Sequence, residues 1–185
     1  MRVLGVSGSL RRDSHNSKLL RAAAALLPSG VELVEFDGLK AIPPFDEDDE
    51  VAPGAEVEAW REAIAQADVI LFATPEYNHS IPGVLKNAVD WASRPSKSAA
   101  LRNKPVAVVG ASTGMFGAVW AQAELRKVLA AAGARVVDRE LPVLSADDAF
   151  TDDGRLIEAE QHDELASIVE QLVTEGQARF STAAV

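Results

Sequence analysis

The chain alternates between two kinds of hydrophobic pattern, and this alternation constrains its fold more than any other feature. Short apolar runs typical of strands occur at Val3–Val6, Val31–Phe36, Val69–Thr74, Val106–Ala111 and Arg135–Asp138. Between and after them, helical periodicity covers Ser17–Leu27, Ala55–Ala67, Val84–Ala92, Val119–Ala132 and Glu158–Gln177. Repeated strand–helix units predict a parallel sheet with helices on both of its faces.

The punctuation of the chain supports a single unit. Pro28-Ser29-Gly30 ends the first helical run, Pro82 suits the first turn of the third helix, and Gly133 follows the fourth helix. No repeat or linker divides the 185 residues. We therefore expect one α/β domain over residues 1–185, a flavodoxin-like three-layer sandwich with a five-stranded parallel sheet in the order 2-1-3-4-5. The last few residues are expected to be disordered.

Composition excludes several classes of function. The chain has no cysteine, which excludes disulfides, thiolate catalysis and cysteine-ligated metal sites. A net charge of −10 argues against nucleic acid as a partner. No apolar stretch approaches the roughly 20 residues of a membrane span, and the first residues already read as a strand rather than a leader. We expect a cytoplasmic protein without membrane insertion, and the acidic run Asp46–Glu50 is interpreted as a solvated loop rather than a calcium site.

Three chemically unusual loops follow the first, third and fourth predicted strands. They are Ser7–Asn16, Pro75–Gly83 and Ser112–Gly117. Because the carboxyl ends of parallel strands meet at one edge of the sheet, these loops are expected to lie together, where such folds bind their ligands.

The first loop has the composition of a phosphate site. A loop that leads into a helix offers free backbone N–H groups and the positive end of the helix dipole. Hydroxyl, amide and guanidinium donors accompany them at Ser7, Ser9, Arg11, Ser14, Asn16 and Ser17. The loop lacks the Walker, dinucleotide and nucleophile-elbow patterns. The alternative interpretation is that its serines only cap the helix.

The other two loops suit a flat ring. Pro75 and Pro82 stiffen the second loop, where Tyr77 could stack on an aromatic ring and Asn78 could face its polar edge; a purely structural turn is the alternative. The hydroxyls and small residues of the third loop would allow close approach of a heterocycle at Ser112, Thr113, Gly114 and Gly117. His79 is a weak candidate for a general base, and the three scattered histidines predict no metal site.

Three segments in this order, GSLRRDSHNSKLL, ATPEYNHSIPGVLKNAVDWAS and STGMFGAVWAQAELRKVL, closely resemble the NADPH-dependent FMN reductase family. That family includes bacterial quinone and chromate reductases and related azoreductases, and the similarity runs from about Met1 to Leu144. The resemblance implies non-covalent FMN, with NADPH or NADH as the co-substrate. One departure is Gly117-Ala118, where many relatives have two adjacent glycines.

The resemblance also implies roles for residues. The FMN phosphate would be held by Ser9, Arg11, Ser14, Asn16 and Ser17. The isoalloxazine would be framed by Pro75, Glu76, Tyr77 and Asn78, and its other edge would meet Ser112, Thr113 and Gly114. Family members commonly form homodimers or homotetramers, and the helix Lys86–Arg94, with Asp90, Trp91 and Arg94, would lie near that contact.

The function expected from this resemblance is hydride transfer from NADPH to bound FMN and then to a small-molecule acceptor, in a ping-pong sequence. The flavin carries the chemistry, so no protein residue is predicted to be catalytic. We hypothesise that Arg11 also attracts the extra phosphate of NADPH. The alternatives are a flavodoxin that exchanges electrons with protein partners, a serine hydrolase using Ser7, and a non-catalytic flavin or nucleotide sensor. The acceptor could be a quinone, a flavin, an azo dye or chromate.

Overall fold

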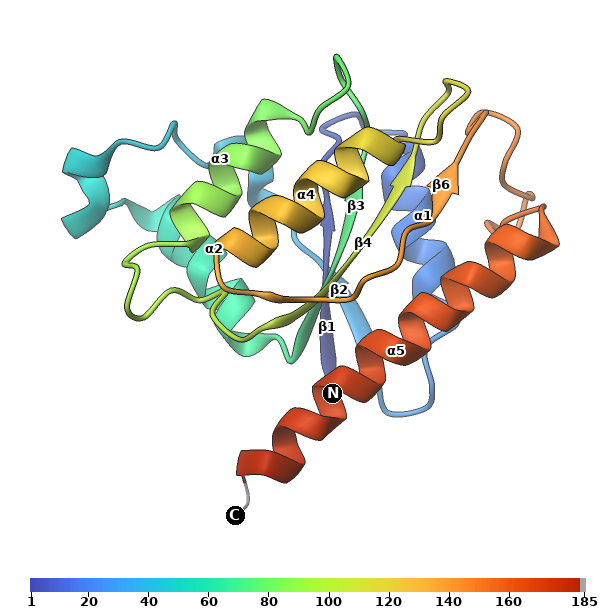
Figure 1. The fold of residues 1–185 in the computed structure, drawn as a ribbon. Coiled ribbons are helices and arrows are strands. Elements are labelled where there is room, and N and C mark those ends of the chain that lie inside the picture. Colours follow the sequence, from blue (N-terminus) through green and yellow to red (C-terminus); the bar gives the residue numbers. More distant parts are fainter. Residues whose placement is uncertain (184–185) are drawn as a thin grey trace.

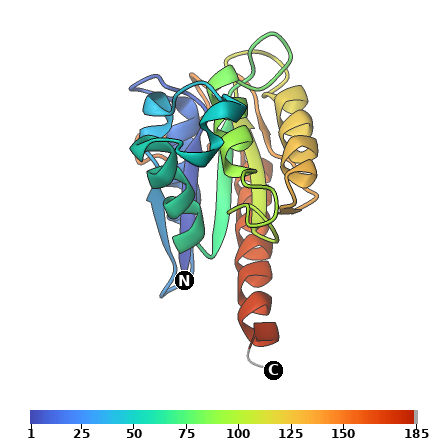
Figure 2. The same ribbon diagram turned by 90° about the vertical axis from the view of Figure 1, so that its left-hand side faces the viewer.

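The computed structural model, which describes residues 1–183, has a parallel sheet between two layers of helices (Figure 1 and Figure 2). Its strands are β1 (Arg2–Ser7), β2 (Glu32–Glu35), β3 (Val69–Thr74), β4 (Pro105–Ala111), β5 (Arg135–Val136) and β6 (Pro142–Val143). Its α-helices are α1 (His15–Ala24), α2 (Ala55–Gln66), α3 (Gly83–Ala92), α4 (Val119–Ala131) and α5 (Ala159–Ala183). Two 3-10 helices, η1 (Gly38–Ala41) and η2 (Glu47–Val51), lie between β2 and α2.

The strand order β2-β1-β3-β4-β5 confirms the predicted flavodoxin-like topology. All of these neighbours are parallel, and the register places Val3 beside Val69 and Ile70 beside Val106. Every residue of β3 and β4 is buried. Their continuous apolar runs therefore have the pattern expected of central strands that are covered on both faces.

The far edge of the sheet differs from the prediction. The expected fifth strand Arg135–Asp138 pairs with β4 only over its first two residues, and the chain then returns as β6, where Pro142 lies beside Gly110. The sheet thus has six strands rather than five. Charged side chains dominate the interrupted stretch 138–140 and lower its strand propensity, while Pro142, which cannot donate a backbone hydrogen bond, is tolerated at a sheet edge.

Each face of the sheet has its own core. Helices α2, α3 and α4 cover one face around the fully buried Trp60 and Trp91, and the indole N–H of Trp60 donates to Ala88 O at 2.8 Å. Helices α1 and α5 cover the other face around Leu20 and Leu165 (Figure 1). The two cores hold the strands rigidly, so the loops at their carboxyl ends start from defined positions.

Other differences from the prediction are local. Helix α1 begins at His15, two residues before the expected start, because Ser14 caps it. The acidic run is exposed but folds into η2, with the Asp46 carboxylate accepting a hydrogen bond from Asp48 N. The end of the chain expected to be disordered includes residues 184–185, which lie outside the described residues. Within residues 1–183, no helix is long and apolar enough to cross a membrane.

Candidate functional site

The three predicted loops meet at the carboxyl edge of β1, β3 and β4 and enclose a pocket of about 110 Å³. We call it the polar pocket; its lining comprises Ser9, Arg11, Ser14, His15, Asn16, Pro75, Glu76, Tyr77, Ala111, Ser112 and Thr113. Three of the predicted site residues do not line it: Asn78 and Gly114 belong to the second and third loops, and Ser17 lies in the first turn of α1. The structure therefore brings most of the predicted cofactor residues together at one pocket, while their roles in binding a cofactor stay a prediction.

Ser14 caps α1. Its Oγ accepts hydrogen bonds from Asn16 N at 3.1 Å and Ser17 N at 3.4 Å, and the residue is buried. The capping interpretation is therefore confirmed for this serine. The cap satisfies two of the N–H groups of the first turn and leaves the positive end of the helix dipole facing the polar pocket.

Asn16 ties the first loop to the end of β4. Its Nδ2 donates to Ala111 O and its Oδ1 accepts from Ala111 N, both at 3.0 Å. Strand β3 ends at Thr74, which lies beside Gly110, so Ala111 extends past its strand neighbour. The side chain of Asn16 thus takes the place of a missing strand, and its amide is occupied by protein rather than turned to a phosphate.

Arg11 supplies the positive charge of the polar pocket. The residue is exposed, and within residues 1–183 its guanidinium forms no ion pair. Below it, Gly8 donates its N–H to Ala73 O, and a side chain there would lie 2.9 Å from Leu85. The absence of a side chain at position 8 lets the loop turn tightly over β3 and presents Arg11 at the rim.

Glu76 has a role that the sequence did not indicate. Its Oε2 accepts hydrogen bonds from Trp120 N and Ala121 N, both at 3.1 Å, at the start of α4. The carboxylate therefore caps a helix 44 residues further along the chain and compensates the positive end of its dipole. Glu76 lines the polar pocket, but its acceptor oxygen is used to join the second loop to α4.

The second loop is stiffened by a tight turn as well as by its prolines. Tyr77 and Ser80 exchange two backbone hydrogen bonds of 3.0 and 3.1 Å, and Asn78 and His79 adopt left-handed φ values of 53° and 60°. The His79 ring packs edge-on against Trp120 with centroids 4.7 Å apart. His79 is exposed and does not line the polar pocket, so the geometry offers no support for a catalytic base there.

The third loop is held from the edge of the sheet. Ser112 N donates to Val143 O, and Ser112 Oγ accepts from Gly114 N at 3.1 Å. Gly117 has φ of 56°, and a side chain there would lie 2.6 Å from the Pro142 backbone, so glycine is required. Ala118, in the position where many relatives have a second glycine, also adopts a left-handed conformation with φ of 61°.

His15 is the site residue that sequence reasoning missed. No role was predicted for it, but its side chain is only 11 % exposed and lines the polar pocket. Its Nε2 lies 3.1 Å from Asp147 Oδ1, yet within residues 1–183 neither ring nitrogen has a partner in hydrogen-bond geometry. No sequence signal indicates this contact, because Asp147 lies in a distant acidic segment.

A second pocket of about 400 Å³ adjoins the first and shares Arg11 and Tyr77 with it. Its other lining residues are Gly8, Leu10, Pro82, Gly83 and Val84. The two pockets together place phosphate-binding chemistry next to apolar surface, with an uncompensated helix dipole and an unpaired arginine at one end. This donor set fits a mononucleotide with one phosphate and a flat ring, as FMN has.

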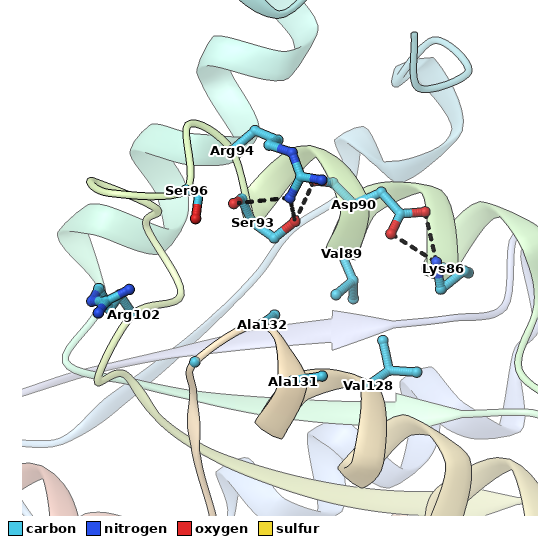
Figure 3. A pocket seen from close by; sticks show the side chains of 11 residues that line it. Lys86, Val89, Asp90, Ser93, Arg94, Ser96, Arg102, Val128, Ala131 and Ala132 are labelled. Carbon is cyan, nitrogen blue, oxygen red and sulfur yellow. Dashed lines mark hydrogen bonds and ion pairs between the residues drawn. The ribbon is translucent and has the colours of Figure 1, made fainter. Parts of the chain in front are cut away.

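A separate groove of about 350 Å³ runs between α3 and α4 (Figure 3). Lys86 and Asp90 of α3 form an ion pair at 2.7 Å on one side of it, and Val128 and Ala131 of α4 lie opposite. This groove contains none of the predicted cofactor residues. It does contain Lys86, Asp90 and Arg94, which the resemblance placed near a contact between subunits.

Comparison with known proteins agrees with the geometry. The sequence profile of the NADPH-dependent FMN reductase family matches residues 1–148. An NAD(P)H-dependent FMN reductase of Pseudomonas aeruginosa is 45 % identical over 161 residues, covering 85 % of each chain. A quinone reductase of Escherichia coli K12 is 38 % identical over 142 residues, covering 75 % of this chain and 74 % of its own.

A solved structure agrees as well. The flavoenzyme NAD(P)H:acceptor oxidoreductase FerB of Paracoccus denitrificans superposes with a TM-score of 0.83 at 31 % identity, covering 96 % of this chain and 97 % of its own. The predicted family, the strand order and the pocket at the switch point of the sheet therefore agree. The chain belongs to the NADPH-dependent FMN reductase family.

Proposed function

We propose that this protein is an FMN-dependent NAD(P)H reductase that delivers electrons to a small quinone-like acceptor. The observation that carries the proposal is the convergence of the three loops on one pocket, with the free positive end of α1 and the unpaired Arg11 on one side of it. Family membership supplies the chemistry that this arrangement serves.

FMN, when bound, supplies a ring that takes hydride from a nicotinamide and passes reducing equivalents on. The residues of this chain have the task of holding and orienting it. Arg11, Ser9 and the first turn of α1 would bind the phosphate, while Asn16 and Ser14 keep that turn in place through their contacts with backbone atoms. Ser17 would contribute from the same turn.

The second and third loops would hold the ring. The hairpin between Tyr77 and Ser80 fixes the backbone of Asn78, and Glu76 anchors that hairpin to α4. Pro75 is buried beneath it, and Ser112, Thr113 and Gly114 would face the opposite edge of the ring. Because these loops are already rigid, binding would need little additional ordering of the backbone.

A quinone is the acceptor class best supported by the relatives. A 2-hydroxy-1,4-benzoquinone reductase of a Burkholderia species is 43 % identical over 130 residues. The apolar surface of Leu10, Pro82 and Val84 beside the polar pocket suits a flat, weakly polar acceptor. Donor and acceptor would use the same open face of the bound FMN in turn, which predicts ping-pong kinetics.

We further propose that the enzyme is a cytoplasmic homodimer or homotetramer. The groove between α3 and α4 supports a contact there, since it combines the apolar Val128 and Ala131 with charged residues of α3. Light scattering of the purified protein would give the oligomeric state. Ala131→Arg is expected to lower it, whereas Glu170→Ala, an exposed position on α5 at the opposite face of the sheet, would leave it unchanged.

The visible spectrum of the purified or FMN-reconstituted protein tests the function directly. We expect oxidised-flavin bands that bleach when NADPH or NADH is added without oxygen, and NADPH oxidation that matches added benzoquinone mole for mole. A flavodoxin would show almost no such oxidation. Failure to bind FMN after reconstitution, or bound FMN that neither nicotinamide bleaches, would contradict the proposal.

The hydrolase alternative has little geometric support. Ser7 Oγ lies 3.4 Å from Ser9 O, and within residues 1–183 no histidine is hydrogen-bonded to it. An activated serine needs a base within hydrogen-bond reach.

A further inference from the structure

A third pocket, of about 600 Å³, lies between α1 and the segment 147–155 that leads to α5. Its size is within the range of roughly 300–1,000 Å³ that is typical of small-molecule sites. One wall is α1, with Lys18, Arg21, Ala22 and Ala25, and the other wall contains Asp147, Phe150, Thr151, Asp152, Asp153, Gly154 and Arg155. None of the residues expected to bind FMN lines it. We call it the α1 pocket.

The two walls of the α1 pocket carry opposite charge. Lys18 and Arg21 are one helical turn apart, and within residues 1–183 neither side chain forms an ion pair or hydrogen bond. On the other wall, Asp153 is already paired with Arg155 at 2.6 Å, whereas Asp152 has no cation partner among the described residues. A ligand that complements this arrangement carries an anionic group toward α1 and hydroxyl or amino groups toward the acidic wall.

The acidic wall is built rather than loose. Thr151 N donates to Arg155 O at 2.8 Å, Gly154 N donates to Thr151 O at 2.9 Å, and Arg155 N donates to the Thr151 hydroxyl. Hydrogen bonds from Thr151 and Arg155 also lower the pKa of Asp153, which keeps its carboxylate charged. Phe150, half-buried, is held on the inner side by the bridge between Phe150 and Leu156. A rigid wall reduces the entropy lost on binding.

The α1 pocket adjoins the polar pocket. His15 lines the polar pocket, Asp147 lines the α1 pocket, and the His15 Nε2 and Asp147 Oδ1 atoms lie 3.1 Å apart. The boundary between the two pockets is therefore one pair of side chains. Because the polar pocket would hold the FMN phosphate, and the Asp147 side chain is 71 % exposed, an extended dinucleotide would cross this boundary on its solvent side.

We propose that the α1 pocket binds the adenosine end of NADPH, with Lys18 and Arg21 recognising its 2′-phosphate; this inference rests on the proposed function. Asp147 and Asp152 would accept hydrogen bonds from ribose hydroxyls or the adenine amine, and Phe150 provides an aromatic surface for the base. Recognition of the 2′-phosphate would make the enzyme prefer NADPH over NADH. This assigns the extra phosphate to Lys18 and Arg21 instead of to Arg11.

The test compares both nicotinamides on FMN-loaded protein. For Lys18→Ala and Arg21→Ala we expect kcat/KM with NADPH to fall about ten- to a hundredfold, as for loss of one charge-assisted phosphate contact, with NADH changed less than about twofold. Lys127→Ala, an exposed lysine on α4 outside the pocket, is the matched control and should change neither value. Equal losses with both nicotinamides, or an unchanged ratio between them, would overturn the inference.

A binding measurement gives a readout independent of turnover. Calorimetry should detect adenosine 2′,5′-bisphosphate binding that weakens at least tenfold in Arg21→Ala, while adenosine 5′-phosphate binding changes little. Binding of the bisphosphate without any change in the NADPH to NADH ratio would overturn the assignment to NADPH and leave a site for a free nucleotide. If NADH still bleaches the flavin while these results fail, only this inference is wrong and the proposed function stands.

Discussion

Two helices begin at the same edge of the sheet, and their N-termini are treated differently. Helix α1 is capped by its own Ser14, a neutral hydroxyl, which leaves the positive end of its dipole uncompensated. Helix α4 is capped by the carboxylate of Glu76, which accepts from Trp120 N and Ala121 N and brings a full negative charge. Of these two helix starts, α1 is therefore the one suited to bind a phosphate.

The difference separates binding from positioning. The α1 end, together with Arg11, offers hydrogen-bond donors and positive charge to a ligand. At the α4 end, the backbone N–H groups donate to the Glu76 carboxylate, and these bonds hold the second loop in place. Residues that line the same pocket can thus have different roles. Substitutions at each end distinguish the two roles.

The largest effect is expected for Asn16→Ala, which removes both hydrogen bonds from this side chain to Ala111. It would leave the buried N–H and C=O of Ala111 without partners, and should lower the free energy of unfolding by about 2–4 kcal/mol in urea titrations. Ser17→Ala, one position along α1, serves as the control. Equal midpoints for the two variants would show that Asn16 does not join the loops as described.

Arg11→Ala should weaken FMN binding by about 1.5–3 kcal/mol, because one charge-assisted contact to the phosphate is lost. Quenching of free-flavin fluorescence measures this affinity. Riboflavin, which lacks the phosphate, should bind the variant as well as it binds the original protein, and the urea midpoint should not move. An unchanged FMN affinity would assign the α1 end to a different ligand.

Glu76→Ala should cost about 1–2 kcal/mol of stability by removing the cap of α4, and Glu76→Gln should cost less because it retains an acceptor oxygen. Thermal midpoints measured with and without sulfate compare the two proteins more sharply. An anion can then occupy the freed helix end, so sulfate should raise the thermal midpoint of Glu76→Ala more than that of the original protein. Equal responses would mean that Glu76 does not compensate the dipole of α4.

Ser14→Ala should produce the smallest loss, about 1 kcal/mol of unfolding free energy in the absence of FMN, since it removes one neutral cap. Ser14→Gly should lower the free energy of unfolding by only about a few tenths of a kcal/mol, because glycine is itself an acceptable N-cap residue. A loss for Ser14→Ala that exceeds that for Glu76→Ala would reverse the ranking of the two caps.

Local features of this site were readable in advance. The predicted run Val69–Thr74 matches β3, the predicted run Val106–Ala111 starts one residue after the start of β4, and Ser14 caps α1. Strand β6 was not predictable, because two residues carry too little periodicity to be recognised as a strand. The role of Glu76 was missed for a different reason: its hydrogen-bond partners lie 44 residues later in the chain, where no local pattern indicates them.

The sequence by itself determined the alternation of strands and helices and the three loops that follow strands, since hydrophobic period, turn residues and caps act over short distances. The strand order was predicted from the fold class that this alternation favours. Only the tertiary structure decided how those loops are used. The Asn16–Ala111 bonds span 95 residues, and the contacts of Glu76 with α4 and of His15 with Asp147 likewise join separate loops. Asn16 and Glu76 bind backbone groups that the strands and α4 leave without partners, and His15 meets Asp147 only because folding brings their segments together.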